Sequence, residues 1–502
     1  MPEHVVIQPA AGRTLSDQLF DLGVEFPCGG VSFCGGCRIR AVSGDIPITA
    51  DMRAALSAGE LAAGWRLAFQ SQASSPVELE IEQWSPRILT DASSVPVEPR
   101  EGTGAVIDLG TTTLVAELVD LNTGEVRGVR TGLNPQGRYG ADVMSRIEFA
   151  LREPGLLTGL IRRTLGAMVG DLASGGNLAE VVLCGNTVMH HLFCDEPVEP
   201  LSHVPFHSPS LGERTFGAAK LEWPMTVRGG VTFLPCPGGF VGSDLLCGLI
   251  ACGMHQMEQD VALLDLGTNG EIAVGNRQRI LCASTAAGPA FEGGRIGMGM
   301  RAGDGAIDKV EIRDGRLHCH VLGGAAPRGI CGSGLLDAAA VALDRGELGS
   351  TGRLANGLRS FPLAGAVELT QADFRELQLA KGAIAAGLIV LLAQAGIASD
   401  QLAAIHLAGA FGNYARIESA RRIGLLPGWS TPVHPIGNSA IRGARTLLLA
   451  PSCRAGLLTQ ALGKTRHIEL ASDPEFQETF VANMVFPASR RPAPNTQPIA
   501  ME

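Results

Sequence analysis

The residues best suited to phosphate chemistry lie at positions 105–118, AVIDLGTTTLVAEL. A short apolar run ends in Asp108, and a turn of small and hydroxyl-bearing residues follows: Gly110, Thr111, Thr112 and Thr113. This pattern predicts a strand, a tight turn and a second strand. Backbone N–H groups in such a turn can approach a phosphate closely, and Asp108 is placed to hold a phosphate-bound Mg²⁺, usually through water. Taken alone, the stretch is equally compatible with an ordinary polar hairpin.

The same pattern returns at positions 261–274, VALLDLGTNGEIAV. Asp265 ends the first apolar run, Glu271 opens the second, and the turn between them contains Gly267, Thr268, Asn269 and Gly270. An internal repeat of this kind predicts two similar lobes that face each other across a cleft. Paired Asp-Gly-Thr hairpins resemble the nucleotide clamp of the actin, hexokinase and seventy-kilodalton-chaperone ATPase superfamily. The resemblance implies that both turns bind ATP with Mg²⁺ and that Asp108, Asp265 and Glu271 are catalytic residues.

A second element is also duplicated, because residues 181–187 and 404–414 each contain a buried-looking strand followed by a glycine turn. The superfamily seats adenosine at the second of these turns, so Gly409 and Gly412 are predicted to bind the nucleotide. An ordinary strand-to-helix turn is the alternative. Asp244 precedes an apolar helix, where an N-cap role is favoured over a role as an active-site acid.

Cys28, Cys34 and Cys37 form a C-x5-C-x2-C pattern in a glycine-rich loop. Glycines allow a loop to wrap a metal–sulfur cluster with N–H groups directed at its sulfurs. The pattern resembles 2Fe–2S ferredoxin domains with adrenodoxin-like spacing, which have a β-grasp fold and require four thiolate ligands.

The fourth ligand is absent from its expected place, since the family motif GWRLACQ corresponds here to residues 64–70, in which Phe69 replaces cysteine. Three interpretations are open. The cluster is lost and the fold retained, a labile cluster persists on three thiolates with water or a serine oxygen such as that of Ser71, or a partner chain supplies the fourth ligand.

Composition limits the class of protein. With 502 residues, two to four domains are expected, and 45% hydrophobic residues suit a well-packed globular chain. A formal net charge of −10 argues against a nucleic-acid partner. We find no transmembrane-length apolar run and no signal-peptide pattern, so we expect no membrane partner and a cytoplasmic location. The 12 cysteines are then expected to be thiols or metal ligands.

The predicted organisation has five parts: a ferredoxin-like α+β domain at 1–85, a Pro- and Ser-rich linker at 86–104, ATPase lobe I at 105–259, ATPase lobe II at 260–486, and a disordered tail at 487–502. The two lobes are expected to be duplicated α/β units of the ribonuclease H-like type. Within them, residues 371–395 are predicted to form one bent helix or a helix pair containing Lys381.

The fusion of these units, together with several further motifs, resembles the reductive activators of corrinoid proteins. The motifs are NPQGRYGADVMSRI, CGNTVMHHLF, LDLGTNGEIA, AAGPAFEGG, GICGSGLLD and HLAGAFGN. The resemblance implies that ATP drives an electron onto the cobalt of a corrinoid methyltransferase protein, from Co(II) to Co(I), with entry through the 2Fe–2S domain. It also makes a homodimer plausible, and it leaves the electron donor unknown. The alternative is a nucleotide-gated, chaperone-like partner of a corrinoid or redox protein that transfers no electron.

Overall fold

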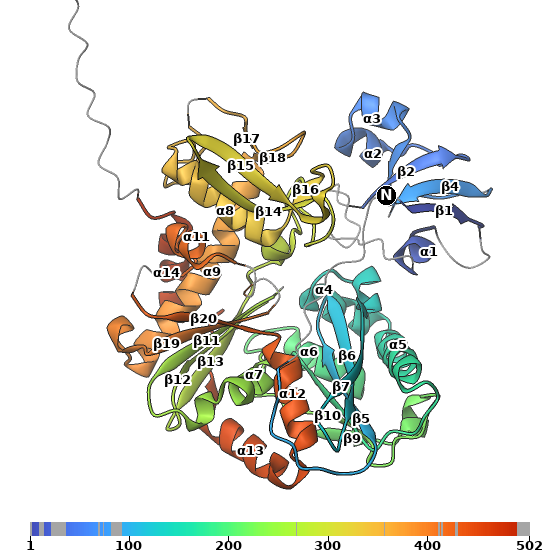
Figure 1. Ribbon diagram of the computed structural model, residues 1–502, viewed down its shortest axis with the longest axis vertical. Helices are drawn as coiled ribbons and strands as arrows, with labels where there is room; N and C mark the ends of the chain where they lie inside the picture. The colour runs from blue at the N-terminus through green and yellow to red at the C-terminus, as the bar shows by residue number, and fades with distance from the viewer. Residues whose placement is uncertain are drawn as a thin grey trace, which may run out of the picture.

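The computed structural model describes residues 3–9, 15–21, 37–68, 71–73, 75–81, 93–267, 269–355, 357–409, 412, 415–426 and 430–488. Figure 1 shows a small N-terminal unit in blue above a first lobe in cyan and green. A second lobe, which runs from green to red, lies beside the first. The arrangement follows from two sheets that each need helices on their apolar faces.

The N-terminal unit is an α+β unit built on one four-stranded sheet with the order β1-β4-β2-β3. All its described pairings are antiparallel. Along β4 the buried side chains alternate with half-buried ones, which places one face of the sheet on a core that includes Leu19 and Met52. The elements are β1 (Glu3–Ile7), α1 (Leu15–Asp21), β2 (Arg38–Ser43), α2 (Ala50–Ala55), α3 (Ala58–Ala62), β3 (Trp65–Leu67) and β4 (Val77–Ile81).

The first lobe contains a six-stranded sheet with the order β7-β6-β5-β8-β10-β9. β5 pairs antiparallel with β6 and parallel with β8, so the first predicted hairpin lies at the centre of the sheet. The strands are β5 (Thr103–Leu109), β6 (Thr113–Asp120), β7 (Val126–Leu133), β8 (Val181–Gly185), β9 (Arg214–Phe216) and β10 (Val231–Phe233). The helices are η2 (Pro135–Arg138), α4 (Val143–Arg152), α5 (Leu156–Ala173), α6 (Thr187–Cys194), η3 (Glu199–Leu201), η4 (Ala218–Leu221), α7 (Ser243–Cys252) and η5 (Met254–Gln256).

The second lobe repeats this sheet, with the order β20-β19-β11-β12-β13-β21. β11 pairs antiparallel with β12 and parallel with β19, as β5 does with β6 and β8. The predicted duplication therefore extends from the hairpins to the strand that carries each glycine turn. The strands are β11 (Val261–Leu266), β12 (Gly270–Gly275), β13 (Ile280–Thr285), β19 (Ala404–Ala408), β20 (Val433–Gly437) and β21 (Thr465–His467).

An insertion follows β13 and forms the upper part of the second lobe in Figure 1. Its longest helix, α9, has the length and apolarity of a membrane span, but 78% of its apolar window is buried, which is the environment of a core helix. The elements between β13 and β19 are η6 (Pro289–Glu292), β14 (Ala306–Arg313), β15 (Arg316–Val321), η7 (Leu322–Gly324), β16 (Gly329–Ile330), α8 (Gly332–Asp344), β17 (Ser360–Pro362), β18 (Glu368–Thr370), α9 (Gln371–Ala395) and η8 (Ser399–Gln401). Two further helices of this lobe are α11 (Ile417–Arg422), between β19 and β20, and α14 (Pro474–Met484), after β21.

Two late helices, α12 (Ser439–Leu449) and α13 (Pro451–Lys464), pack against the first lobe although they lie between β20 and β21 of the second sheet in sequence. α12 crosses α7 so closely that a Cβ on Gly443 would lie 2.0 Å from the carbonyl oxygen of Cys247. A fully buried ion pair between Arg445 and Glu117, 2.6 Å apart, fixes α12 to β6. The described part of the predicted linker also lies here, because Val95 and Val97 pack on the same core.

Candidate functional site

The turn of the first hairpin, between β5 and β6, is held by side-chain amides from two other elements. Within the turn, the N–H of Gly110 donates to the carbonyl oxygen of Thr113 at 3.0 Å. Asn134 Nδ2 donates to the carbonyl oxygen of Gly110 at 2.9 Å, and Asn186 Nδ2 donates to Thr111 Oγ1 at 2.8 Å. A Cβ on Gly110 would lie 2.6 Å from the Thr113 carbonyl oxygen. Glycine is therefore required by the tightness of the turn, and its own N–H is already bonded inside it.

The turn of the second hairpin, between β11 and β12, has a matching geometry. The N–H of Gly267 donates to the carbonyl oxygen of Asn269 at 3.1 Å, and Thr285 Oγ1 donates to that of Gly270 at 3.1 Å. Asp265 and Glu271 face each other in register across the two strands. Thr268 lies outside the described residues. The hairpin thus brings together two of the residues predicted to be catalytic, Asp265 and Glu271.

Four carboxyl groups share one electrostatic environment between the two sheets. Burial raises the pKa of Asp108 to about 6, an effect that the hydrogen bond from Asn438 opposes. Burial and then the charge of Asp108 raise the pKa of Asp265 to about 7. For Asp244, burial followed by the charges of Asp108 and Asp265 raises the pKa to about 8. Burial, with Asp244 and Asp265 next, raises the pKa of Glu271 well above its ordinary value.

Such a concentration of half-buried and buried carboxyls is unfavourable unless positive charge is brought to it. Mg²⁺ usually takes only one or two protein carboxylates and keeps water and phosphate oxygens as its other ligands. The described residues contain no group of three or more side chains arranged to hold a metal by themselves. The donor set at Asp108 and Asp265 fits a Mg²⁺ that arrives with a polyphosphate, held through water, and the phosphates would then complete its coordination.

The two glycine turns lie directly beside the carboxylates. At the end of β8, a Cβ on Gly185 would come within 2.5 Å of the carbonyl oxygen of Leu109. At the end of β19, Gly409 has a φ of +85°, and a Cβ there would lie 2.8 Å from Asp265 Oδ1. Gly412 is similarly close to Leu407, whereas residues 410 and 411 lie outside the described residues. Gly409 therefore keeps the space around the Asp265 carboxylate open.

Asn438 was not predicted as a site residue, and Asp244 was predicted in a different role. Asn438 caps α12 through its Oδ1, which accepts from the N–H of Ile441 at 3.0 Å, and its Nδ2 reaches Asp108. The N-cap of α7 is Gly242, without a side-chain bond, so the preferred N-cap role of Asp244 is wrong. Asp244 lies in the first turn of α7, next to the other three carboxyls. Asparagine directly before a helix is a common N-cap, and this was the sequence signal that could have identified Asn438.

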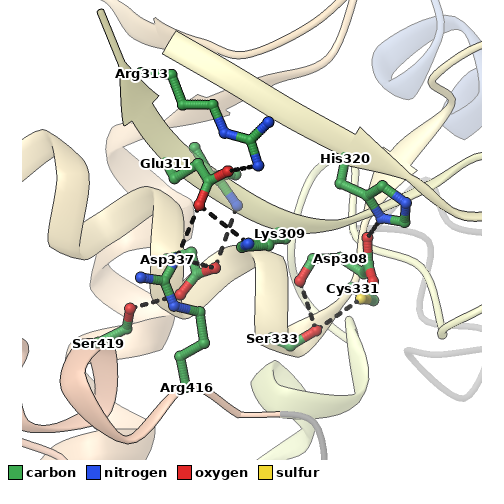
Figure 2. Close-up of polar contacts among 11 residues, drawn as sticks. Asp308, Lys309, Glu311, Arg313, His320, Cys331, Ser333, Asp337, Arg416 and Ser419 are labelled. Carbon is green, nitrogen blue, oxygen red and sulfur yellow. Dashed lines mark hydrogen bonds and ion pairs between the residues drawn. The ribbon is translucent and has the colours of Figure 1, made fainter. Parts of the chain in front are cut away.

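A polar network fixes the segment after the second glycine turn to the inserted domain (Figure 2). Asp337 on α8 accepts from Ser419 Oγ at 2.5 Å and lies 3.5 Å from Arg416 Nη1. Its Oδ2 also accepts from the N–H of Val310 on β14 at 3.2 Å. Arg416 in addition approaches Glu311, at 3.9 Å. Because Asp337 is only 1% exposed, this network joins α8, α11 and β14 from within.

Of the three predicted cluster ligands, only Cys37 lies among the described residues, and its side chain is buried. Cys28, Cys34 and Phe69 lie outside them. The proposed alternative ligand Ser71 is 2% exposed, and its hydroxyl donates to the carbonyl oxygen of Leu67 at 2.8 Å. The serine oxygen is therefore already engaged with the backbone in this conformation.

Comparisons with known proteins agree with this geometry. Residues 103–257 match the family model described as the RACo middle region, and residues 260–497 match the one described as the C-terminal domain of RACo, the ASKHA domain. The chain is 37% identical over 418 residues to the corrinoid activation enzyme RamQ of Eubacterium limosum, which covers 76% of this chain and 70% of that protein.

Two further relatives agree. Identity is 29% over 421 residues to the [Co(II) methylated amine-specific corrinoid protein] reductase of Methanosarcina barkeri, covering 76% of this chain and 77% of that protein. A solved structure described as a reductive activator for corrinoid, iron-sulfur protein superposes with a TM-score of 0.70 at 25% identity, covering 96% of each chain.

Proposed function

Because the chain belongs to the family of ATP-dependent reductive activators of corrinoid proteins, we propose that it binds MgATP between its two hairpins to drive reduction of a partner's cobalt. The partner is a corrinoid-binding methyltransferase protein whose cobalt has reached the inactive Co(II) state, and the product is Co(I). One electron is added to the cobalt, supplied by a low-potential donor.

The observation that carries this proposal is the meeting of carboxylates from both lobes. Asp108 ends β5 of the first lobe and Asp265 ends β11 of the second, and the charge of each raises the pKa of neighbouring carboxyls. A polyphosphate with Mg²⁺ would relieve this repulsion and bridge the two hairpins. Binding would then favour a closed arrangement of the lobes, which is the kind of change that nucleotide hydrolysis reverses.

The crossing of α7 and α12 supports a movement of one lobe against the other. α12 lies between β20 and β21 of the second sheet in sequence but packs on the first, and α7 follows the first sheet but shares a core with strands of the second. Both helices begin at the carboxylate cluster, with Asp244 on α7 and Asn438 at the cap of α12. A nucleotide that moves the N-terminal end of either helix would therefore move both lobes, and with them the surface that the corrinoid partner contacts.

The N-terminal unit fits this function only in part. A 2Fe–2S cluster, when bound, supplies a one-electron carrier, but it needs four thiolates. This chain offers Cys28, Cys34 and Cys37, with Phe69 at the fourth place. Since the donor set does not fit a complete cluster, the residues of this chain account for nucleotide binding, and the electron donor stays unassigned.

This incomplete set also favours a second candidate function. A protein that binds the corrinoid partner in a nucleotide-gated manner, without passing an electron, would need the same ATPase lobes and no intact cluster. The two candidates differ in one observable. Only the activator produces Co(I) in the partner when a chemical reductant and MgATP are both present.

The test uses the full-length chain with Asp265→Asn, and with Glu258→Gln as its matched control, because the side chain of Glu258 is 77% exposed in an ion pair outside the site. We expect calorimetry to show MgATP binding by wild type and Glu258→Gln, and at least about tenfold weaker binding by Asp265→Asn. When a chemical reductant and MgATP are both present, absorbance of the corrinoid partner should report Co(I). Absence of MgATP binding by wild type at millimolar nucleotide would defeat both candidates.

A further inference from the structure

In both lobes, a side chain from outside the nucleotide turn is hydrogen-bonded to that turn. In each lobe, a side chain at the end of the third strand donates a hydrogen bond to a glycine carbonyl of the hairpin turn. In the first lobe this is Asn134 to Gly110 at 2.9 Å, and in the second it is Thr285 to Gly270 at 3.1 Å. The positions differ, because Thr285 is the direct strand partner of Gly270, whereas Asn134 lies one residue beyond Leu133, the strand partner of Thr113. A 3₁₀-helix that begins with proline then follows, η2 in the first lobe and η6 in the second.

Asn134 holds the first turn from both sides. Besides its Nδ2 bond to Gly110, its backbone N–H donates to the carbonyl oxygen of Thr112 at 2.9 Å. Its Oδ1 accepts from the N–H of Gln136 at 3.0 Å, so the same side chain caps η2. Asn134 is only 2% exposed, and losing any of these bonds without water to replace it is costly. The turn and η2 are therefore linked through one rigid residue.

The segment beyond Asn134 is also held as one body. The buried guanidinium of Arg146 on α4 donates to the carbonyl oxygen of Gly140 at 2.9 Å and to Gln136 Oε1 at 3.4 Å. Arg146 and Asn134 both donate to Met189 Sδ, at 3.6 and 3.4 Å. Asn134, Gln136 and Gly140 are thus tied to Arg146 and Met189 by buried hydrogen bonds.

The two 3₁₀-helices lead to different peripheral units. η2 lies against α1 of the N-terminal unit, and Leu133, directly before Asn134, packs on the core of that unit. In Figure 1, α1 occupies the part of the N-terminal unit that is nearest the first lobe. η6 instead lies against α8 and α9 of the insertion in the second lobe. Each hairpin is thereby connected to one unit outside the ATPase sheets.

We propose that Asn134 is a positioning residue that couples the nucleotide state of the first hairpin to the N-terminal unit. The inference rests on the proposed function, because it requires nucleotide at this hairpin. A γ-phosphate that changes the turn would move the carbonyl groups of Gly110 and Thr112, and Asn134 is bonded to both. η2 and α1 would follow, so the N-terminal unit would respond differently to ATP and ADP.

The experiment measures hydrogen–deuterium exchange in peptides covering residues 15–21 and 135–138 of the full-length protein, with MgATP or MgADP. We expect wild type to show about fivefold or greater difference in exchange between the two nucleotides in both peptides. Asn134→Asp keeps the cap acceptor and the backbone bond to Thr112, but it replaces the donor to Gly110 with an acceptor. Because Asn134 holds the nucleotide turn, exchange is compared at MgATP and MgADP concentrations that saturate this variant, and it should then have lost the response at 15–21.

Thr285→Val is the control in the second lobe, since it removes the side-chain bond to Gly270; it should keep the response at 15–21. Leu133→Ala removes the side chain that packs on the N-terminal core and keeps the backbone that pairs with Thr113, and it should lose the response. If Asn134→Asp fails to fold, Leu133→Ala decides the question. The coupling alone is overturned if Asn134→Asp or Leu133→Ala keeps the wild-type response at 15–21. It is also overturned if wild type binds nucleotide but shows no response at 15–21. Absence of nucleotide binding by wild type overturns the coupling together with the proposed function.

Discussion

Asn438 at the cap of α12 donates a hydrogen bond from Nδ2 to Oδ2 of Asp108 on β5, at 3.1 Å and 330 positions away in sequence. The bond favours the ionised form of Asp108 and lowers a pKa that burial raises. The amide of Asn438 therefore prepares this carboxylate for a cation and joins the start of α12 to the first hairpin.

The first prediction concerns this bond. Asn438→Asp retains a cap acceptor for Ile441 but replaces the donor to Asp108 with a negative charge. We expect MgATP affinity to fall by about tenfold or more, because Asp108 then shares its site with a fifth carboxyl group. Calorimetry with MgATP measures the loss, and circular dichroism checks that the fold is kept. An affinity equal to that of wild type would show that Asn438 does not act on Asp108.

The second prediction is a pH dependence of nucleotide binding. The pKa values of Asp108, Asp265 and Asp244 are raised to about 6, 7 and 8, so these groups hold protons at pH 6 that a cation must displace. MgATP affinity should rise as the pH increases from about 6 to about 8 and level off above that range. Calorimetry in two buffers with different ionisation heats should detect proton release. Asp265→Asn should release fewer protons, and a pH-independent affinity would contradict the shared carboxylate environment.

Much of the ATPase fold could be predicted because its signals are local. The short apolar runs and the small turn residues between them identified both hairpins. The repeat of strand and glycine turn identified β8 and β19 as strands, and the structure adds that they pair with β5 and β11. The segment 371–395 is one helix, α9, as one of the two alternatives proposed.

The relationships that complete the site could not be predicted, because they depend on tertiary packing. Nothing near Asn438 in the sequence indicates that α12 returns to the first lobe, where a buried ion pair of Arg445 and Glu117 fixes it. The prediction that Asp244 is an N-cap was wrong for a local reason. Both Gly242 and Asp244 are acceptable near a helix start, and only the backbone geometry identifies the cap. Asn134 carried no signal beyond its place in a turn.

The third prediction concerns the network around Asp337. Asp337→Asn removes the charge that faces Arg416 and leaves one hydrogen-bond acceptor where Ser419 and Val310 need two. Because the side chain is buried, we expect a loss of about 2 kcal/mol in the free energy of unfolding. Denaturant titration measures it. Glu311→Gln, at the more exposed edge of the same network, is the control and should lose less than half as much. Equal losses would place the stabilisation at the surface ion pairs instead.

The fourth prediction concerns the cysteine motif. Protein purified without oxygen should contain well under one 2Fe–2S cluster per chain, because Phe69 stands where the fourth thiolate is expected. Phe69→Cys should raise the iron and sulfide content toward a full cluster. The same assay on Cys37→Ser should give less iron than wild type. A full complement of iron and sulfide with a normal ferredoxin spectrum in wild type would refute the prediction.

The fifth prediction concerns Lys381, which is 1% exposed on α9 and donates to the carbonyl oxygen of Val485 at 2.6 Å. Burial lowers its pKa from 10.5 to about 8. Between these values the unfolded chain binds this proton more tightly than the folded protein does, so the contribution of Lys381 to the free energy of unfolding should rise by about 3 kcal/mol as the pH increases from about 8 to about 10.5. Burial raises the pKa values of thiols such as Cys252, which act in the opposite sense over this range, so the contribution is measured as the difference between wild type and Lys381→Met. Lys381→Met should remove this rise, and Lys220→Met, at an exposed lysine, should keep it. Denaturant titrations at pH 8 and pH 10 measure the difference, and an unchanged rise in Lys381→Met would assign it to another group.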